Sequence, residues 1–127
     1  MVPMLLLALT ALIAADAALE GRWKNPSGRV TVEIVACEEA YCGSVISATE
    51  SARADARRGG TANLVGTQLM SGFKPAGPGK WRGRMFVPDI NHRSKAELRL
   101  LGANQLKVTG CMVGRMICKS QLWTRAD

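Results

Sequence analysis

The residues of this chain that could catalyse a reaction are few. His92 is the single histidine among 127 residues, and Asp89 lies three positions before it. A serine hydrolase combines Ser, His and an acid, and its nucleophile commonly lies in a G-x-S-x-G turn, but the sequence has no such turn. The adjacent Glu38 and Glu39 point to opposite sides of an extended chain, so they do not naturally flank one glycosidic bond. We therefore predict no catalytic residue and place His92 in a solvated turn.

Four cysteines form two closely spaced pairs, Cys37 with Cys42 and Cys111 with Cys118. The spacings C-x4-C and C-x6-C differ from the C-x2-C of common zinc sites, so we predict no metal and no cofactor. In a short exported chain, four cysteines predict disulfides. Three pairings are possible. The two local bridges fit best, because residues opposite each other on antiparallel strands have Cα atoms about 4.5–5.5 Å apart, within disulfide reach.

Basic residues outnumber acidic ones, 17 to 10, which gives a formal net charge of +7. Lys80, Arg82 and Arg84 lie in one expected strand, and alternation puts Arg82 and Arg84 on a common face. If that face is outside, it can contact anionic lipid headgroups or phosphorylated envelope glycans. Nucleic acid is not an expected partner of an exported protein. The alternative interpretation is an ordinary solvated face.

Trp23 near the first expected strand and Arg125 near the last can stack where a sheet closes on itself. A guanidinium over an indole ring contributes about 0.5–2 kcal/mol. We predict that this pair seals one end of a barrel. The alternative is that the two side chains form the floor of a ligand cavity.

The first 17 residues have the pattern of a signal peptide. An apolar run of Leu and Ala ends at Ala15-Asp16-Ala17, an A-x-A cleavage site, and the run is shorter than the ~20 residues of a membrane span. The alternative is a buried N-terminal helix. We expect residues 18–127 to form one periplasmic or secreted domain, and this mature part contains no stretch long enough to span a membrane.

Short strands are the elements that would position these residues. Val30, Val32 and Ile34 alternate with polar residues, which is typical of a half-buried strand, and Asn25–Gly28 has the composition of a tight turn. Residues 50–63 are expected as a surface excursion with one helical turn over 52–57, and residues 72–79 as a Gly/Pro loop. The expected strands are residues 20–24, 29–36, 43–49, 64–70, 80–87, 95–100, 105–112 and 117–125.

Eight short strands with hairpin-length connections predict an all-β fold, a single antiparallel up-and-down β-barrel. The first strand would lie beside the last, residues 20–24 beside 119–125. An eight-stranded interior is either filled by side chains or holds one small ligand. The inward positions that decide between the two are Val32, Ile34, Met85, Leu98 and Val108.

Several motifs resemble the family called domain of unknown function 2147, small exported bacterial proteins. The motifs are Gly21-x-Trp23, Cys37-x4-Cys42-Gly43, Gly66–Pro75, Gly79-Lys80-Trp81-x-Gly83, Leu106-Lys107-Val108-x-Gly110 and Ser120–Arg125. The resemblance implies a compartment and a domain but no catalytic residues. The family usually has Tyr-Asp-Pro, a Gly turn and another Tyr where this chain has Phe86-Val87-Pro88 and Asp89-Ile90-Asn91, so an activity tied to that loop is in doubt here. Gly-x-Trp in the first strand and Arg in the last are also similar to lipocalin-type barrels.

These observations favour a non-enzymatic, monomeric exported β-barrel that binds a small apolar ligand or an anionic envelope component. The first alternative is a structural or interaction protein of the envelope with a filled core. The second is a hydrolase whose site the sequence does not reveal.

Overall fold

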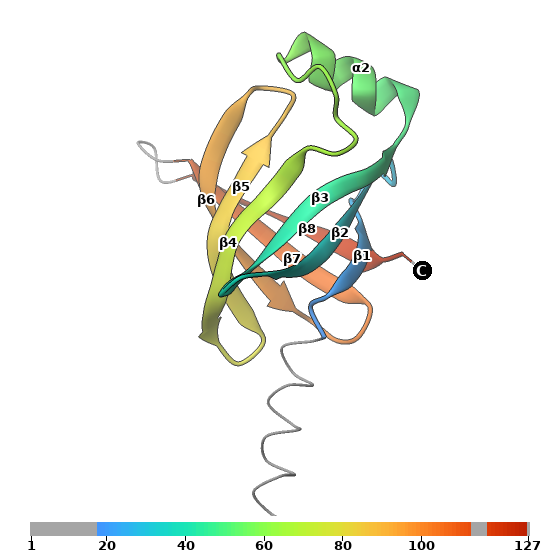
Figure 1. Cartoon of the computed structure of the whole chain (residues 1–127). Coiled ribbons are helices and arrows are strands. Elements are labelled where there is room, and N and C mark those ends of the chain that lie inside the picture. The colour runs from blue at the N-terminus through green and yellow to red at the C-terminus, as the bar shows by residue number, and fades with distance from the viewer. Residues whose placement is uncertain (1–17, 113–116, 127) are drawn as a thin grey trace, which may run out of the picture.

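The computed structural model describes residues 18–112 and 117–126, which form one closed antiparallel barrel with strand order β1 to β8 (Figure 1). The predicted signal peptide lies outside the described residues and stays a prediction. No helix in the described part is long and apolar enough to cross a bilayer. The elements are β1 (Gly21–Lys24), β2 (Val30–Cys37), β3 (Ala40–Ala48), α2 (Glu50–Arg58), β4 (Gln68–Gly77), β5 (Lys80–Val87), β6 (His92–Leu100), β7 (Gln105–Met112) and β8 (Ile117–Arg125).

The barrel closes between the first and the last strand. Trp23 pairs with Arg125 and Lys24 with Thr124 in antiparallel register. The other neighbours are consecutive hairpins, as an up-and-down meander requires. The predicted eight-stranded barrel is therefore confirmed, including the contact between its two ends. The pairing of β1 with β8 covers only these two residue pairs, so β8 from Ile117 to Trp123 has no β1 partner within the described residues.

The strand predicted over residues 64–70 is wrong in its bounds, and the loop predicted over 72–79 is mostly strand. β4 runs from Gln68 to Gly77 and contains Pro75. It has no β3 partner beyond Phe73, so the N–H that proline lacks is not needed on that side. The register shifts between Ser71 and Lys74, and Gly72 in this bulge has φ of 63°, a conformation that glycine adopts without strain.

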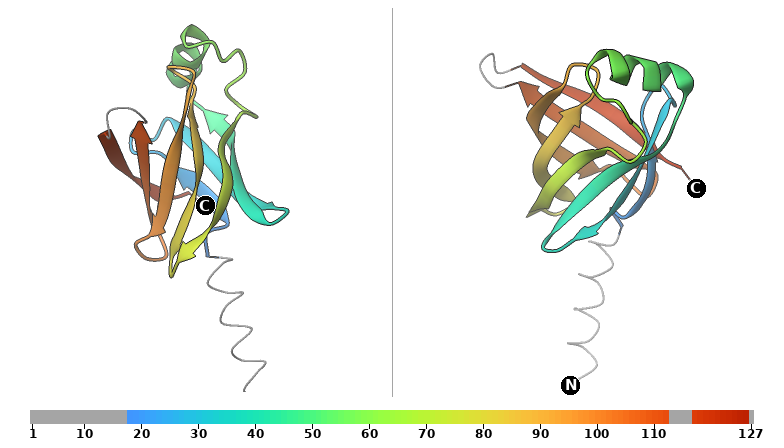
Figure 2. Two further views of the ribbon diagram at one scale, coloured as in Figure 1. Left: turned by 90° about the vertical axis from the view of Figure 1, so that its left-hand side faces the viewer. Right: turned by 45° about the horizontal axis from the view of Figure 1, so that its top comes forward.

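The surface excursion contains a longer helix than the single turn predicted. α2 has nine residues, and the side chain of Thr49 caps it by accepting a hydrogen bond from the Ala52 amide. Ala52 and Ala56, one helical turn apart, are its buried residues. The helix has no large apolar side chain, which is why periodicity alone underestimated it. α2 lies at one end of the barrel, opposite the end where β1 begins (Figures 1 and 2).

The other end of the barrel is filled with large apolar side chains. Trp23, Phe73, Leu98 and Leu106 are each fully buried. Tyr41 and Trp81 contact one another edge to face there, with ring centroids 6.4 Å apart. This packed half forms most of the core and fixes the shape of the barrel.

Candidate functional site

A cavity of about 600 Å³ opens at the α2 end of the barrel. Its rim comes from α2, from the β1–β2 turn at Asn25 to Ser27 and from the β5–β6 loop at Pro88 to Ile90, and its walls come mainly from β2 and β5 to β8. Val30, Leu69, Met85, Val108 and Trp123 contribute apolar surface, and Ser94, Lys119 and Gln121 contribute polar groups. We call this space the mouth cavity.

The mouth cavity exists because inward-facing side chains become small or polar along three adjacent strands. Strand register aligns them in rows across β6, β7 and β8: Leu100–Leu106–Trp123, then Leu98–Val108–Gln121, then Ala96–Gly110–Lys119. The first row contains only large apolar residues. The third has two very small residues beside a long cationic one, so little side-chain volume fills the centre at that level.

On β8, the polar side chains of Lys119 and Gln121 line the cavity, and Trp123 lies at the inner end of this row. Its ring is buried, and its Nε1 donates a hydrogen bond to Oε1 of Gln121 at 3.1 Å. Lys119 follows on the same side of β8, opposite Gly110. A Cβ added at Gly110 would meet only the Ser94 hydroxyl, at 3.4 Å. Within the described part of the chain Lys119 forms no ion pair, so its charge is available to a ligand.

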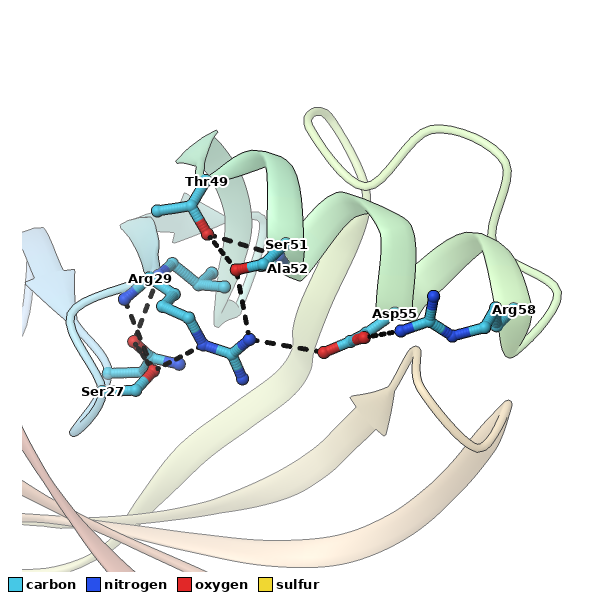
Figure 3. Close-up of polar contacts among 9 residues, drawn as sticks. Ser27, Arg29, Thr49, Ser51, Ala52, Asp55 and Arg58 are labelled. Carbon is cyan, nitrogen blue, oxygen red and sulfur yellow. Dashed lines mark hydrogen bonds and ion pairs between the residues drawn. The ribbon is translucent and has the colours of Figure 1, made fainter.

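Helix α2 is tied to both sides of the cavity rim. On one side Arg29 donates to Ser27, Ser51 and Asp55, with a 3.3 Å ion pair to Asp55 (Figure 3). On the other side Gly59, which caps the helix, lies against the backbone of Pro88 and Asp89, where a Cβ would come within 2.3 Å of two carbonyl oxygens. The helix therefore bridges the two loops that border the mouth.

The structure places Trp23 and Arg125 at the opposite end of the barrel. The Arg125 guanidinium carbon lies 4.1 Å from the Trp23 ring centre. The same guanidinium donates to the carbonyls of Ala18, Glu20 and Ala103 at 2.7–2.9 Å. Trp23 Nε1 donates to the Leu19 carbonyl at 3.0 Å. We call the Trp23–Arg125 contact and these hydrogen bonds the latch, and this end of the barrel the latch end. The described lining of the mouth cavity includes neither Trp23 nor Arg125, so the latch is separate from the candidate site.

Both local disulfides are present, Cys37–Cys42 and Cys111–Cys118. Cys111 and Cys118 are directly opposite one another in the register. Cys37 and Cys42 are not, because Cys37 pairs with Ala40, so the first bridge runs diagonally across its hairpin with a Cα–Cα distance of 5.9 Å. The Cys111–Cys118 bridge lies next to the Gly110–Lys119 pair and joins β7 to β8 at the level of the hollow row Ala96–Gly110–Lys119.

The other candidate residues from the sequence do not form catalytic arrangements within the described part of the chain. Glu38 and Glu39 form the exposed turn between β2 and β3. The solvated turn predicted for His92 is wrong, because His92 begins β6, pairs with Val87 and is half-buried. His92 and Asp89 both lie at the cavity rim, but no hydrogen bond within the described residues joins them. Lys80, Arg82 and Arg84 lie on β5 with the parity of its outward face. Ser94, Lys119 and Gln121 were not predicted from the sequence as site residues.

Comparisons with known proteins agree with this architecture. A family model described as "Uncharacterized protein conserved in bacteria (DUF2147)" matches residues 21–125. Among solved structures the chain is similar to protein HP1028 from Helicobacter pylori, described as belonging to the lipocalin family, with a TM-score of 0.67 over 86% of this chain and 83% of that one. The identity is 12%, so this similarity shows the fold alone. No curated protein matches the sequence. The resemblances predicted from the motifs are confirmed.

Proposed function

The chain belongs to the DUF2147 family of bacterial proteins, and we propose that its barrel binds one small amphiphilic molecule in the mouth cavity. The apolar part of the ligand lies against Met85, Val108 and Trp123, and an anionic group lies near Lys119. The observation that carries the proposal is the change of inward-facing residues along β6, β7 and β8, which leaves this half of the barrel hollow. A cavity of about 600 Å³ is within the usual range for small-molecule sites.

The architecture supports a binding role. Eight-stranded barrels are wide enough to hold one small ligand, and the similar solved structure is described as a lipocalin. The first alternative, a structural protein with a filled core, fits the latch end but does not account for the cavity. We propose that no reaction accompanies binding, because the described lining contains no nucleophile hydrogen-bonded to a base, the usual arrangement for covalent catalysis.

We further propose that the protein acts as a monomer in the periplasm or outside the cell. Two disulfides support an oxidising compartment. Closure of the sheet between β1 and β8 supports a monomer, because it covers part of the edge that a second copy could extend.

Titration with the fluorescent probe anilinonaphthalene sulfonate, an apolar body with one sulfonate, tests the site. We expect one binding site per barrel. Gly110→Leu places a large side chain in the hollow row and should weaken binding at least tenfold. Ser120→Leu adds the same side chain to the outward face of the same strand pair and should leave binding unchanged. Equal affinity in Gly110→Leu and wild type would place the probe elsewhere and overturn the proposal.

Native mass spectrometry of protein isolated from its own cells addresses the natural ligand. A bound mass that is absent from Gly110→Leu supports the proposal. An apo mass combined with no probe binding favours the structural alternative. Turnover in an esterase and glycosidase screen that is lost in His92→Ala would instead establish the hydrolase.

A further inference from the structure

The outward face of strands β4 to β6 is a cationic array. Six residues define this basic face: Lys74, Lys80, Arg82, Arg84, Lys95 and Arg99. Strand register makes them three pairs of direct neighbours, Lys74 with Arg82, Lys80 with Arg99 and Arg84 with Lys95. Like charges directly opposite each other on adjacent strands destabilise a sheet. Three such pairs on one face therefore lower the stability of the folded protein. A face that is only in contact with water has no need of this arrangement.

Acidic partners are scarce on the basic face. Glu97 alone contacts it in the described part of the chain, at 3.6 Å from Arg82 and 3.8 Å from Arg99. Helix α2 is different, because its arginines are all paired: Glu50 contacts Arg53 and Arg57 at 3.0 Å each, and Asp55 contacts Arg58. The chain therefore neutralises the cations of α2, whereas Lys74, Lys80, Arg84 and Lys95 of the basic face form no ion pair within the described residues. An external anion can contact these four cations.

The tip of the central hairpin of this face presents one large apolar side chain, between the exposed Asp89 and Asn91. Ile90, in the loop between β5 and β6, is 61% exposed, the highest value among the exposed large hydrophobic side chains described. Next to the loop, the guanidinium of Arg93 stacks on Phe86 with 4.8 Å to the ring centre. Cations beside exposed apolar and aromatic groups are typical of proteins that bind at a lipid–water interface.

We propose that the basic face docks onto an anionic phospholipid bilayer, with Ile90 in the interfacial region. Ile90 favours a bilayer over a soluble polyanion, because an apolar tip gains nothing from a ligand that lies wholly in water. Nucleic-acid surfaces use aromatic stacking platforms or an element that enters a groove, and the single aromatic ring here is covered by Arg93. Ile90 also borders the mouth cavity, so docking would bring that opening to the membrane. The docking itself does not depend on what the cavity binds.

Co-sedimentation with vesicles tests the proposal. The full mature chain should bind phosphatidylcholine vesicles that contain phosphatidylglycerol, should not bind pure phosphatidylcholine vesicles, and should be released by salt. Each Lys or Arg at an anionic surface changes partitioning by about fivefold. Arg84→Gln/Lys95→Gln should therefore lower partitioning by at least tenfold. The matched control Arg22→Gln/Lys24→Gln removes the same charge from β1, across the barrel from β5, and should change partitioning by less than about threefold.

Thermal unfolding and a third variant distinguish docking from misfolding and from simple charge attraction. Arg84→Gln/Lys95→Gln removes a repulsive pair, so its melting temperature should equal or exceed that of wild type, which excludes misfolding as the cause of lost binding. Ile90→Ser should weaken binding several-fold at unchanged net charge. Equal losses in the basic-face and control variants would show a general charge effect and overturn the proposal. Absence of binding to the anionic vesicles, or binding to heparin alone, would also overturn it.

Discussion

The two ends of the barrel are built from the same strands but have opposite interiors. At the latch end, Trp23, Leu98 and Leu106 are fully buried. Arg125 donates hydrogen bonds to two backbone carbonyls just before β1 and to one in the β6–β7 turn. At the mouth, the same strands β6 to β8 present Ser94, Gly110 and Lys119 around a cavity. The comparison indicates that the two ends have different roles. Packing at the latch end stabilises the barrel, and the mouth end has room for a ligand.

The largest predicted effect contrasts two large apolar side chains, one at each end. Leu98→Ala removes a fully buried side chain from the packed half and should destabilise the protein by about 2–5 kcal/mol. Met85→Ala trims a side chain that already borders the mouth cavity and should cost less than about half as much. Urea denaturation of both variants measures the two free energies of unfolding. Similar losses would show that the two ends are packed alike.

The next effect concerns the latch. Arg125→Ala removes three hydrogen bonds from a charged donor and the contact with Trp23. We expect the free energy of unfolding to fall by about 2 kcal/mol. The loss is near the low end of the range for hydrogen bonds from a charged donor, because the guanidinium is partly exposed. Thermal unfolding measures it, and probe binding at the mouth should persist. Arg22→Ala removes an arginine whose one ion pair is exposed and serves as the control. Equal decreases in melting temperature for both variants would show that the latch does not stabilise the barrel more than an ordinary exposed arginine does.

Much of the barrel wall and of the latch could be predicted from the sequence. Val30, Val32 and Ile34 alternate plainly along β2, and the closing pair of Trp23 and Arg125 occupies the first and last strands. Alternation indicates inward positions wherever residues on one face are apolar. The bounds of β4 were harder, because Gly72 and Pro75 are typical of loops and are accommodated here only by a bulge and a partly unpaired strand.

The mouth was not predictable in the same way. Gly110 and Lys119 have no apolar pattern to mark them as inward, and Ala96, Gly110 and Lys119 form a row only once the register of three strands is known. Helix α2 is short, and its buried face consists of two alanines. Every second residue of a strand points to the same side, so Lys119 and Gln121 share the inward side of β8 with Trp123. This alternation is the signal in the sequence that could have identified them as lining residues.

A smaller effect tests the polar wall of the mouth. Lys119→Met keeps the length and apolar stem of the side chain but removes its charge. Dodecanoate should bind the variant about tenfold more weakly than wild type, which corresponds to about 1.4 kcal/mol and to the loss of one charge-assisted hydrogen bond. Dodecanol, with the same chain and no charge, should bind both proteins equally. Calorimetric titration measures the affinities. Parallel losses for both ligands would mean that Lys119 acts through the shape of the cavity instead.

The smallest effect concerns how α2 is held over the mouth. A hydrogen bond from Arg57, with the charges of Arg53 and Arg57, lowers the pKa of Glu50 from its usual 4.5. A carboxyl whose pKa falls on folding stabilises the native state above its unfolded-state pKa, and this contribution disappears as the pH falls through the folded-state value. Wild type should therefore melt slightly above Glu50→Gln at neutral pH, and the gap should narrow as the pH falls below 4.5, the usual pKa of this carboxyl. Glu39→Gln, at an exposed turn without an ion pair in the described part, is the control for the general effect of removing one carboxylate. A gap for Glu50→Gln that stays constant across this range would mean that its ion pairs do not stabilise α2. Because the helix rests on surface charges and two alanines whereas the latch rests on buried rings, the mouth is the end that acid should loosen first.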